Sequence, residues 1–383
     1  MNRRRFFKGL GATAAGALLQ SPWARADADF ARVLVLVELQ GGNDGLNTVV
    51  PYADPLYRRL RPTLVLSREQ VLPLDERAGL HRALEPLWPL WTAGELAIIQ
   101  GLGYPDPNLS HFRSIEIWNT ASASDETLDD GWVGRAFRAV PPPATLAAHG
   151  VVVGGEDGPL EAVGPRVIRL SDTARFLRQS RLAAPGGPGS NAALRHILSV
   201  EAAIDEAARG LDTGIRFSTA FPATPFGRAV HTACEAIASH GGVAAVKLSL
   251  GGFDTHVGQA ARHPRLLAEL AGGLVALRAA IMELGRWDRT LVMTYSEFGR
   301  RPRENLGGGT DHGTAACHFL AGGRVRGGLH GAALRLDRLD GAGNPEQTTD
   351  YRRLYAAVLE RWWRIDGAQV LGRPWMALPV LPA

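Results

Sequence analysis

The chain has 383 residues, of which 45% are hydrophobic and 21% are charged, so it has enough core for one large domain or two ordinary ones. Its formal net charge is only +4, and no dense basic run appears beyond the N-terminus, which argues against nucleic acid as a partner. Two cysteines, Cys234 and Cys317, cannot make a disulfide framework. Their apolar surroundings predict buried free thiols, with a single structural disulfide as the alternative.

The first 26 residues have the pattern of a twin-arginine (Tat) signal peptide. Arg3-Arg4-Arg5-Phe6-Phe7-Lys8 is followed by a short apolar run from Gly9 to Leu19 and by the small residues of Ala24-Arg25-Ala26. A Sec signal or a basic tail is the alternative. The apolar run is too short to span a membrane. We therefore expect the Tat machinery to export the protein to the periplasm or the exterior, with a mature chain that begins near Asp27.

Strand-like and helix-like segments alternate through most of the mature chain. Continuous aliphatic runs typical of buried strands lie at 32–39, 96–100, 150–154, 243–250 and 290–295. Helical patterns lie between them, at 52–61, 81–94, 110–118, 225–240 and 264–284. This alternation predicts an α/β fold with a mainly parallel sheet covered by helices on both faces. We expect one domain from 27 to 383, in which about 155–225, with a Pro-Gly-rich connector at 185–190 and an Ala-rich helix at 191–210, forms a peripheral insertion.

Acidic and imidazole side chains follow several of the predicted strands, at the edge where open α/β sheets place their ligands. Carboxylates and imidazoles together are the donor set of one- or two-metal hydrolytic sites. Taken singly, each residue has a simpler interpretation as a helix cap or a turn residue. Asp311 and His312 sit on a predicted glycine-rich turn before an apolar run at 315–320. The combination predicts a divalent metal site that contains Asp44, Asp254, His256, Glu297, Asp311 and His312.

Ser110 stands at the predicted start of a helix. An ordinary N-cap is the simpler interpretation of this serine. A helix N-terminus also stabilises developing negative charge, so Ser110 could instead be a catalytic nucleophile. Arg113, Arg300 or Arg301 could then bind an oxyanion through the forked donors of the guanidinium group.

These motifs, in this order, resemble the domain of unknown function 1501 family, exported bacterial proteins that usually carry a Tat signal. The matching segments are Gly41-Gly42-Asn43-Asp44-Gly45-Leu46-Asn47, Ser110-His111-Phe112, Gly131-Trp132-Val133-Gly134-Arg135, Gly252-Phe253-Asp254-Thr255-His256, Glu297-Phe298-Gly299-Arg300, Gly309-Thr310-Asp311-His312-Gly313 and Gly322-Gly323-Arg324-Val325-Arg326-Gly327-Gly328. That family in turn resembles the alkaline phosphatase and sulfatase superfamily. The resemblance implies an alkaline-phosphatase-like fold, with metal ligands among the acidic and histidine residues and Ser110 as the nucleophile.

The pattern departs from both superfamily models. Asp254 and His256 are two positions apart, where phosphatases place the histidine four positions after the aspartate. The segment Leu109-Ser110-His111-Phe112-Arg113 lacks the proline of the sulfatase motif, which argues against formylglycine chemistry. The resemblance therefore indicates a fold more firmly than a reaction.

Together with this resemblance, the motifs predict an exported metal-dependent hydrolase or transferase at a two-metal-type site, and the resemblance implies a phosphate or sulfate ester as its substrate. The metal would be zinc, manganese, magnesium or calcium. The alternative is a non-catalytic exported protein of the same fold, which binds metal or takes part in envelope assembly. The expected partner is a small anionic ester in the first case and an envelope component in the second.

The export pattern can be tested directly. Replacing Arg3 and Arg4 by lysine should leave uncleaved precursor in the cytoplasm, because the arginine pair is the feature that directs a precursor to the Tat route. Cell fractionation and immunoblotting would show the outcome. Normal export and cleavage of the double-lysine variant would mean that the twin-arginine interpretation is wrong.

Overall fold

A computed structural model describes residues 28–171, 211 and 214–382. The predicted signal peptide, the connector at 185–190 and the Ala-rich helix expected at 191–210 lie outside these residues. No helix in the described ranges is long and apolar enough to cross a membrane.

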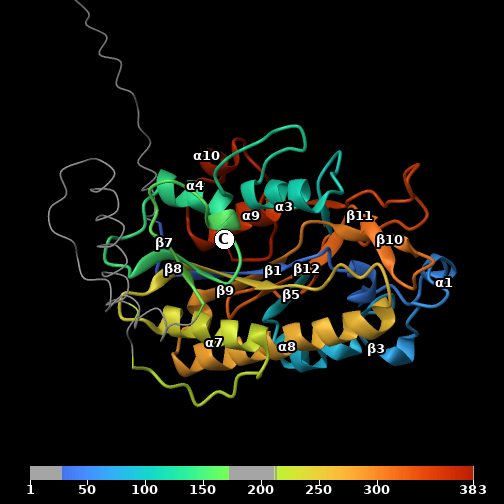
Figure 1. The fold of residues 1–383 in the computed structure, drawn as a ribbon, viewed down its shortest axis with the longest axis horizontal. Coiled ribbons are helices and arrows are strands. Elements are labelled where there is room, and N and C mark those ends of the chain that lie inside the picture. Colours follow the sequence, from blue (N-terminus) through green and yellow to red (C-terminus); the bar gives the residue numbers. More distant parts are fainter. Residues whose placement is uncertain (1–27, 172–210, 212–213, 383) are drawn as a thin grey trace, which may run out of the picture.

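The central sheet has the spatial order β13-β5-β12-β9-β1-β8-β6-β7, with β14 paired to β5. Figure 1 labels β1, β5, β7, β8, β9 and β12 of this sheet. Its strands are β1 (Val33–Leu39), β5 (Leu96–Gly103), β6 (Ala148–Val153), β7 (Val167–Leu170), β8 (Val243–Leu250), β9 (Thr290–Tyr295), β12 (Ala316–Ala321), β13 (Gly328–His330) and β14 (Thr349–Asp350). Strand β12 runs antiparallel to both of its neighbours, and the other pairings are parallel. The sheet is mainly parallel, as predicted. Strand β7, inside the range expected to be a peripheral insertion, forms one of its edges.

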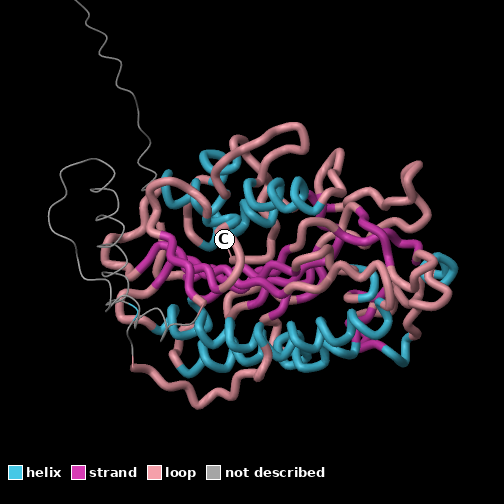
Figure 2. Tube along the Cα trace, in the orientation of Figure 1, coloured by secondary structure: helices cyan, strands magenta, loops and turns pink. Residues whose placement is uncertain are grey.

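Helices cover both faces of the sheet (Figure 2). One layer contains α7 (Pro225–Ala238) and α8 (Gln259–Glu283), with η3 (Arg82–Leu87) and α2 (Trp88–Thr92); the other contains α3 (His111–Thr120), α4 (Trp132–Ala139), α9 (Arg352–Ala357), η6 (Val358–Trp362) and α10 (Gly367–Leu371). Alternate side chains of β1 point to opposite faces, as in any strand. Val35 and Val37 pack in the core with α7 and α8, whereas Leu34 and Leu36 pack with α3, α4 and α9.

Two small sheets lie beside the central one. The first is formed by β2 (Val49–Val50), β3 (Val71–Pro73) and β4 (Gly79–His81), near α1 (Pro55–Leu60). The second is an antiparallel pair of β10 (Gly299–Glu304) and β11 (Thr310–Gly313), in which Arg300 lies opposite His312. Asp311 and His312 are therefore on a strand and not on the predicted turn. A side chain at Gly313 would have its Cβ 2.4 Å from the backbone of Arg300, so the two strands meet at glycine.

The carboxyl ends of β1, β5, β8 and β9 lie along one edge of the sheet, because these strands run in the same direction. The loops that leave this edge carry Asp44, Asp254 and Glu297, and the loop after β5 leads to His111, the first residue of α3. Gly41 allows two of the loops to touch: its φ is +112°, and an added Cβ would lie 2.3 Å from the backbone nitrogen of Asp254. The predicted position after a strand of the central sheet is thus confirmed for Asp44, Asp254 and Glu297, whereas Asp311 and His312 lie within β11 of a separate sheet.

Candidate metal centre

Three side chains from distant parts of the chain bring possible metal-binding atoms within 4.8 Å of one another. They are His111, Asp254 and His312. His111 is the first residue of α3, Asp254 lies in the loop after β8, and His312 is in β11. The Nε2 atom of His312 is 3.4 Å from Asp254 Oδ1, and Nε2 of His111 is 3.7 Å from Asp254 Oδ2. Two imidazoles therefore flank the two oxygens of one carboxylate.

The other nitrogen of each imidazole is already committed to an acceptor. Nδ1 of His111 is 2.8 Å from Glu297 Oε1, and Nδ1 of His312 is 2.9 Å from the carbonyl oxygen of Leu109. A carboxylate or carbonyl oxygen can only accept, so each Nδ1 carries the proton and each Nε2 of the neutral ring has a lone pair. Two lone pairs then face the Asp254 carboxylate, an arrangement that a cation between them would stabilise. Histidines that bind metals are commonly held in this way by a carboxylate or a carbonyl behind the ring.

His312 is suited to this role by its environment as well as by its tautomer. Burial lowers its pKa, the hydrogen bond to the Leu109 carbonyl offsets part of that effect, and the positive charge of Arg300 lowers the pKa further. The net shift is downward. Neutral imidazole is the form that binds a metal.

His256, which we predicted as a metal ligand, lies directly beside this group of three but is not part of it. Its Nε2 atom is 3.0 Å from both Asp254 Oδ1 and His312 Nε2. Its Nδ1 atom is 3.4 Å from Asp311 Oδ1, and Asn305 donates to the same oxygen at 3.0 Å. The hydrogen bond from Asn305, together with His256, outweighs burial and lowers the pKa of Asp311. Asp311, which we also predicted as a metal ligand, thus contacts His256 from the side away from Asp254 and lies outside the group of three, where it can position the His256 imidazole.

Glu297 also lies behind an imidazole. The side chain is almost fully buried, and its Oε1 accepts from the backbone N–H of Gly41 at 2.8 Å as well as from His111. Ser296 Oγ lies 3.1 Å from the other oxygen and 2.6 Å from the carbonyl oxygen of Leu39, so its single proton is shared between these two acceptors. We predicted Glu297 as a metal ligand, but the structure places it where it orients His111.

Arg300 holds Asp254 in place. The arginine side chain is fully buried and its NH2 group is 2.7 Å from Asp254 Oδ1. The remaining donors reach the carbonyl oxygens of Gly41, Gly42, Phe253 and Thr310. Burial alone would raise the pKa of Asp254, but the hydrogen bond and charge of Arg300 hold it below its usual value. Arg300 was expected to bind a substrate oxyanion, but these contacts use its guanidinium inside the protein.

Arg113 also differs from its predicted role. Its guanidinium donates to the carbonyl oxygens of Ala123, Ser124 and Glu126 and forms an ion pair of 2.7 Å with Glu116. These contacts fix the segment that follows α3. The guanidinium therefore serves the local structure, because a carbonyl-rich turn lies within its reach.

Ser110 is the N-cap residue of α3 and is exposed. Its side chain makes no capping hydrogen bond. The residue before it, Leu109, holds His312 through its carbonyl oxygen, and the residue after it is the ligand candidate His111. The structure thus places the predicted nucleophile at the centre's border, while the interpretation as a simple N-cap lacks the expected hydrogen bond.

Asp44 lies apart from the group of three. Its carboxylate is fully buried and receives both arms of Arg61, at 2.5 Å and 3.0 Å, together with the side-chain amide of Gln259. Burial alone would raise the pKa of Asp44, but the charge and hydrogen bonds of Arg61 lower it. An arginine therefore supplies the positive charge that we expected from a metal.

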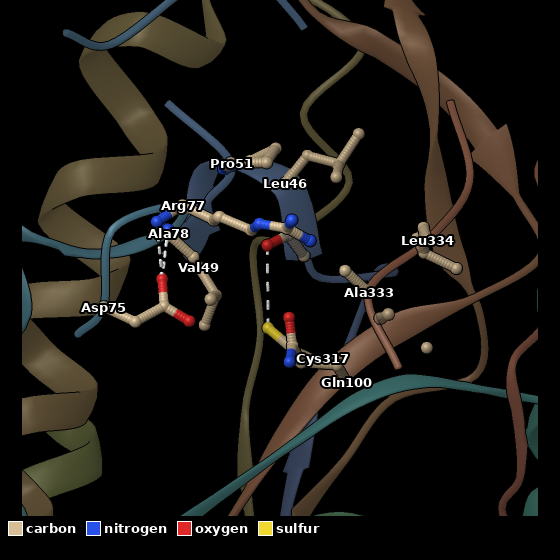
Figure 3. Close-up of a pocket in the computed structure, with 13 residues that line it drawn as sticks. Leu46, Val49, Pro51, Asp75, Arg77, Ala78, Gln100, Cys317, Ala333 and Leu334 are labelled. Atoms are coloured by element: carbon tan, nitrogen blue, oxygen red, sulfur yellow. Dashed lines mark hydrogen bonds between the residues drawn. The ribbon is translucent and has the colours of Figure 1, made fainter. Parts of the chain in front are cut away.

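A cavity that none of the candidate metal ligands lines is bordered by segments that include η1 (Gly45–Asn47), β2, β5 and β12 (Figure 3). Cys317 lies there, with its Sγ atom 3.6 Å from the carbonyl oxygen of Gly45. Burial raises the pKa of Cys317 to about 12, so the thiol is protonated and a poor nucleophile. Cys317 and Cys234 are both buried and free, as predicted.

Sequence reasoning assigned no role to His111. The residue stood inside the quoted Ser110-His111-Phe112 motif, but the argument there concerned the serine. Its signal was positional: His111 follows β5 at the same sheet edge as the other predicted ligands. Its orientation depends on Glu297, which is 186 residues away in the sequence, and no local pattern reports that contact.

The importance of Arg300 can be measured with a conservative change. Arg300→Lys keeps the charge but loses the forked geometry, which leaves buried carbonyl oxygens without donors. We expect the free energy of unfolding to fall by about 3 kcal/mol, measured by urea denaturation. Arg303→Lys, an exposed position on the same strand, is the matched control and should change stability little. Equal stability of the two variants would contradict this assignment.

Comparison with known proteins gives one family and several distant structural likenesses. Ps i-CgsB, crystallised with k-i-k-neocarrahexaose, is 11% identical, with 90% of this chain and 72% of that chain covered and a TM-score of 0.38. The C-terminal periplasmic domain of EcEptC from Escherichia coli, in complex with Zn, is 8% identical, with coverage of 76% and 73% and a TM-score of 0.36. Alkaline phosphatase from the Antarctic bacterium TAB5 is 12% identical, with coverage of 76% and 91% and a TM-score of 0.32.

These identities and TM-scores are too low to bear on activity. No curated protein matches the chain. Residues 91–373 match the family model described as "Protein of unknown function (DUF1501)". The chain therefore belongs to the DUF1501 family.

Proposed function

We propose that the protein is a metal-dependent hydrolase or transferase that acts on a phosphate or sulfate ester. The observation that carries the proposal is the pair of imidazole lone pairs, on Nε2 of His111 and His312, that face the Asp254 carboxylate. Three side chains whose possible ligand atoms lie within 4.8 Å of one another, each held by a further protein group, form a site that a divalent cation would complete.

The donors favour zinc or a similar transition metal. Imidazole nitrogen suits zinc, whereas magnesium and calcium prefer sites made of oxygen. Two imidazoles and one carboxylate also match the three protein ligands of catalytic zinc sites, which keep a fourth position open. We infer a single ion at this centre, because Asp44, the expected ligand from β1, is paired with Arg61.

The chain offers two further groups for ester chemistry. When bound, the metal would polarise the ester oxygens and lower the pKa of Ser110 or a water molecule. Ser110 lies at a helix N-terminus, which favours developing negative charge. Arg301 is the remaining arginine for an oxyanion: its Nε atom is buried without a hydrogen-bond partner among the described residues, and its charge acts on Asp311.

A non-catalytic metal-binding or envelope-assembly protein is the second candidate function. One observation favours it: Arg113 and Arg300, two of the three arginines expected to grip an anion, are occupied by internal contacts. We also propose export through the Tat machinery, supported by the Arg3-Arg4 pair and the small residues near position 26.

Metal analysis and turnover separate these functions. His312→Ala should lower bound zinc by about tenfold or more, because a ligand is removed. Ser110→Ala should retain the metal and lower the turnover of aryl phosphate or aryl sulfate esters by roughly a thousandfold, since a nucleophile contributes mainly to the transition state. Elemental analysis of the dialysed mature protein and a chromogenic assay give the two readouts.

His231→Ala is the matched control, because it removes a half-exposed imidazole on α7 without touching the centre. It should change neither readout. Circular dichroism would verify that each variant is folded. Mature protein that retains no metal would contradict the metal centre. Retained metal with no turnover of either ester by the unmodified protein would favour the non-catalytic function.

A further inference from the structure

A cleft opens beside the candidate metal centre, on the side of His111. It lies on the α3 face of the sheet, between α3, the loop after β6, and the ends of β1 and β8. The residues that line it are Glu38, Gln40, His111, Phe112, Ile115, Asn119, Gly155, Glu156, Gly158, Lys247 and Glu297. His111 and Glu297 belong to both places, so a molecule in the cleft would adjoin the metal centre.

The floor of the cleft contains a buried ion pair. Lys247 Nζ is 2.6 Å from Glu38 Oε2, and the two side chains are 2% and 8% exposed. Lys247 also donates to the carbonyl oxygen of Glu156 at 3.0 Å and to Ser249 Oγ at 3.3 Å, which uses its three N–H donors. Glu38 Oε1, in contrast, has no hydrogen-bond partner among the described residues. The ion pair thus presents one free hydrogen-bond acceptor, Glu38 Oε1, and the negative charge of that carboxylate is compensated by Lys247.

The charges of the cleft disfavour an ionic ligand. A negatively charged ligand would be repelled by the carboxylates of Glu38, Glu156 and Glu297. A cation would find Glu38 already paired with Lys247 and Glu297 already accepting from His111 and Gly41. Only the solvent-exposed carboxylate of Glu156 would attract it, and an exposed charge attracts weakly. A neutral group that can donate and accept hydrogen bonds avoids both penalties.

The walls combine free amides with an exposed ring. Gln40 is exposed, and its side-chain amide has no partner within the described ranges. Asn119 accepts from the Tyr295 hydroxyl at 3.4 Å, which leaves its amide nitrogen available. Phe112 is 88% exposed, so the face of its ring is free to contact another molecule.

We propose that this cleft is a subsite for a neutral pyranose ring. The C–H face of such a ring would pack on Phe112, and its hydroxyl groups would pair with Glu38, Gln40 and Asn119. An alkyl chain in the same place would leave these polar groups without partners. If the proposed ester chemistry is correct, the sugar is the alcohol part of the ester; this assignment alone rests on the proposed function, since binding needs no turnover.

Equilibrium binding tests the subsite. The mature protein, as purified and after treatment with a chelator, would be titrated with the methyl glycosides of glucose, galactose, mannose and N-acetylglucosamine, and also with choline and hexanol. Saturation-transfer NMR or calorimetry would report binding. We expect at least one glycoside to bind saturably in both forms, more tightly than choline or hexanol.

Two variants locate the bound sugar. Phe112→Ala should weaken glycoside binding about tenfold, because it removes the stacking surface. Gln40→Ala, which removes a side chain with no other partner, should weaken it several-fold. Leu306→Ala is the matched control: this side chain is fully exposed near the metal centre but does not line the cleft, and its loss should change nothing.

Several outcomes would overturn the subsite. These are no saturable binding of any of the four glycosides, tighter binding of choline or hexanol, or equal effects of Phe112→Ala and Leu306→Ala. Because the titration is repeated without metal, a protein that binds a glycoside but no zinc would contradict the metal centre and leave the subsite standing. A protein that binds zinc but no glycoside would contradict the subsite and leave the metal centre standing.

Discussion

The buried guanidinium group of Arg300 is the interaction on which the candidate centre depends. It donates to backbone carbonyls in the loops after β1 and β8 and in β11, and it pairs with Asp254. Buried carbonyl groups without donors are costly, so these segments are held together by the need to satisfy them. Arg300 also lies opposite His312 in the β10–β11 ladder. One side chain thereby fixes the relative positions of two of the three candidate ligands.

Buried arginines also explain why the candidate centre contains fewer possible metal ligands than the sequence suggested. We expected crowded carboxylates to require divalent cations. The protein instead neutralises Asp44 with Arg61 and partly compensates Asp254 with Arg300. Asp254 keeps nearly half of its side chain exposed and faces two imidazoles, whereas Asp44 is sealed from solvent. Only the exposed carboxylate is therefore placed to share a metal ion.

Sequence patterns were sufficient for the sheet but not for the contacts of the centre. The boundaries of β8 and β9 agree with their aliphatic runs, because buried parallel strands are recognisable from continuous hydrophobicity. The β10–β11 pair was missed because its residues are mainly polar or glycine and show no alternation. The placement of Arg300 was also beyond the sequence, since its carbonyl acceptors Gly41 and Gly42 lie more than 250 residues away. Arg61 was overlooked because its partner, Asp44, was predicted to bind a metal ion instead of an arginine.

X-ray absorption spectroscopy of the zinc-loaded mature protein tests the central claim most directly, because it reports the atoms bound to the ion. The account predicts Zn–N and Zn–O distances of about 2.0–2.2 Å, with the multiple scattering of two imidazoles. The imidazole contribution should fall by about half in His312→Ala, as one of the two ligands is removed. A shell made only of oxygen, or a spectrum unchanged by that substitution, would contradict the placement of a metal between His111, Asp254 and His312.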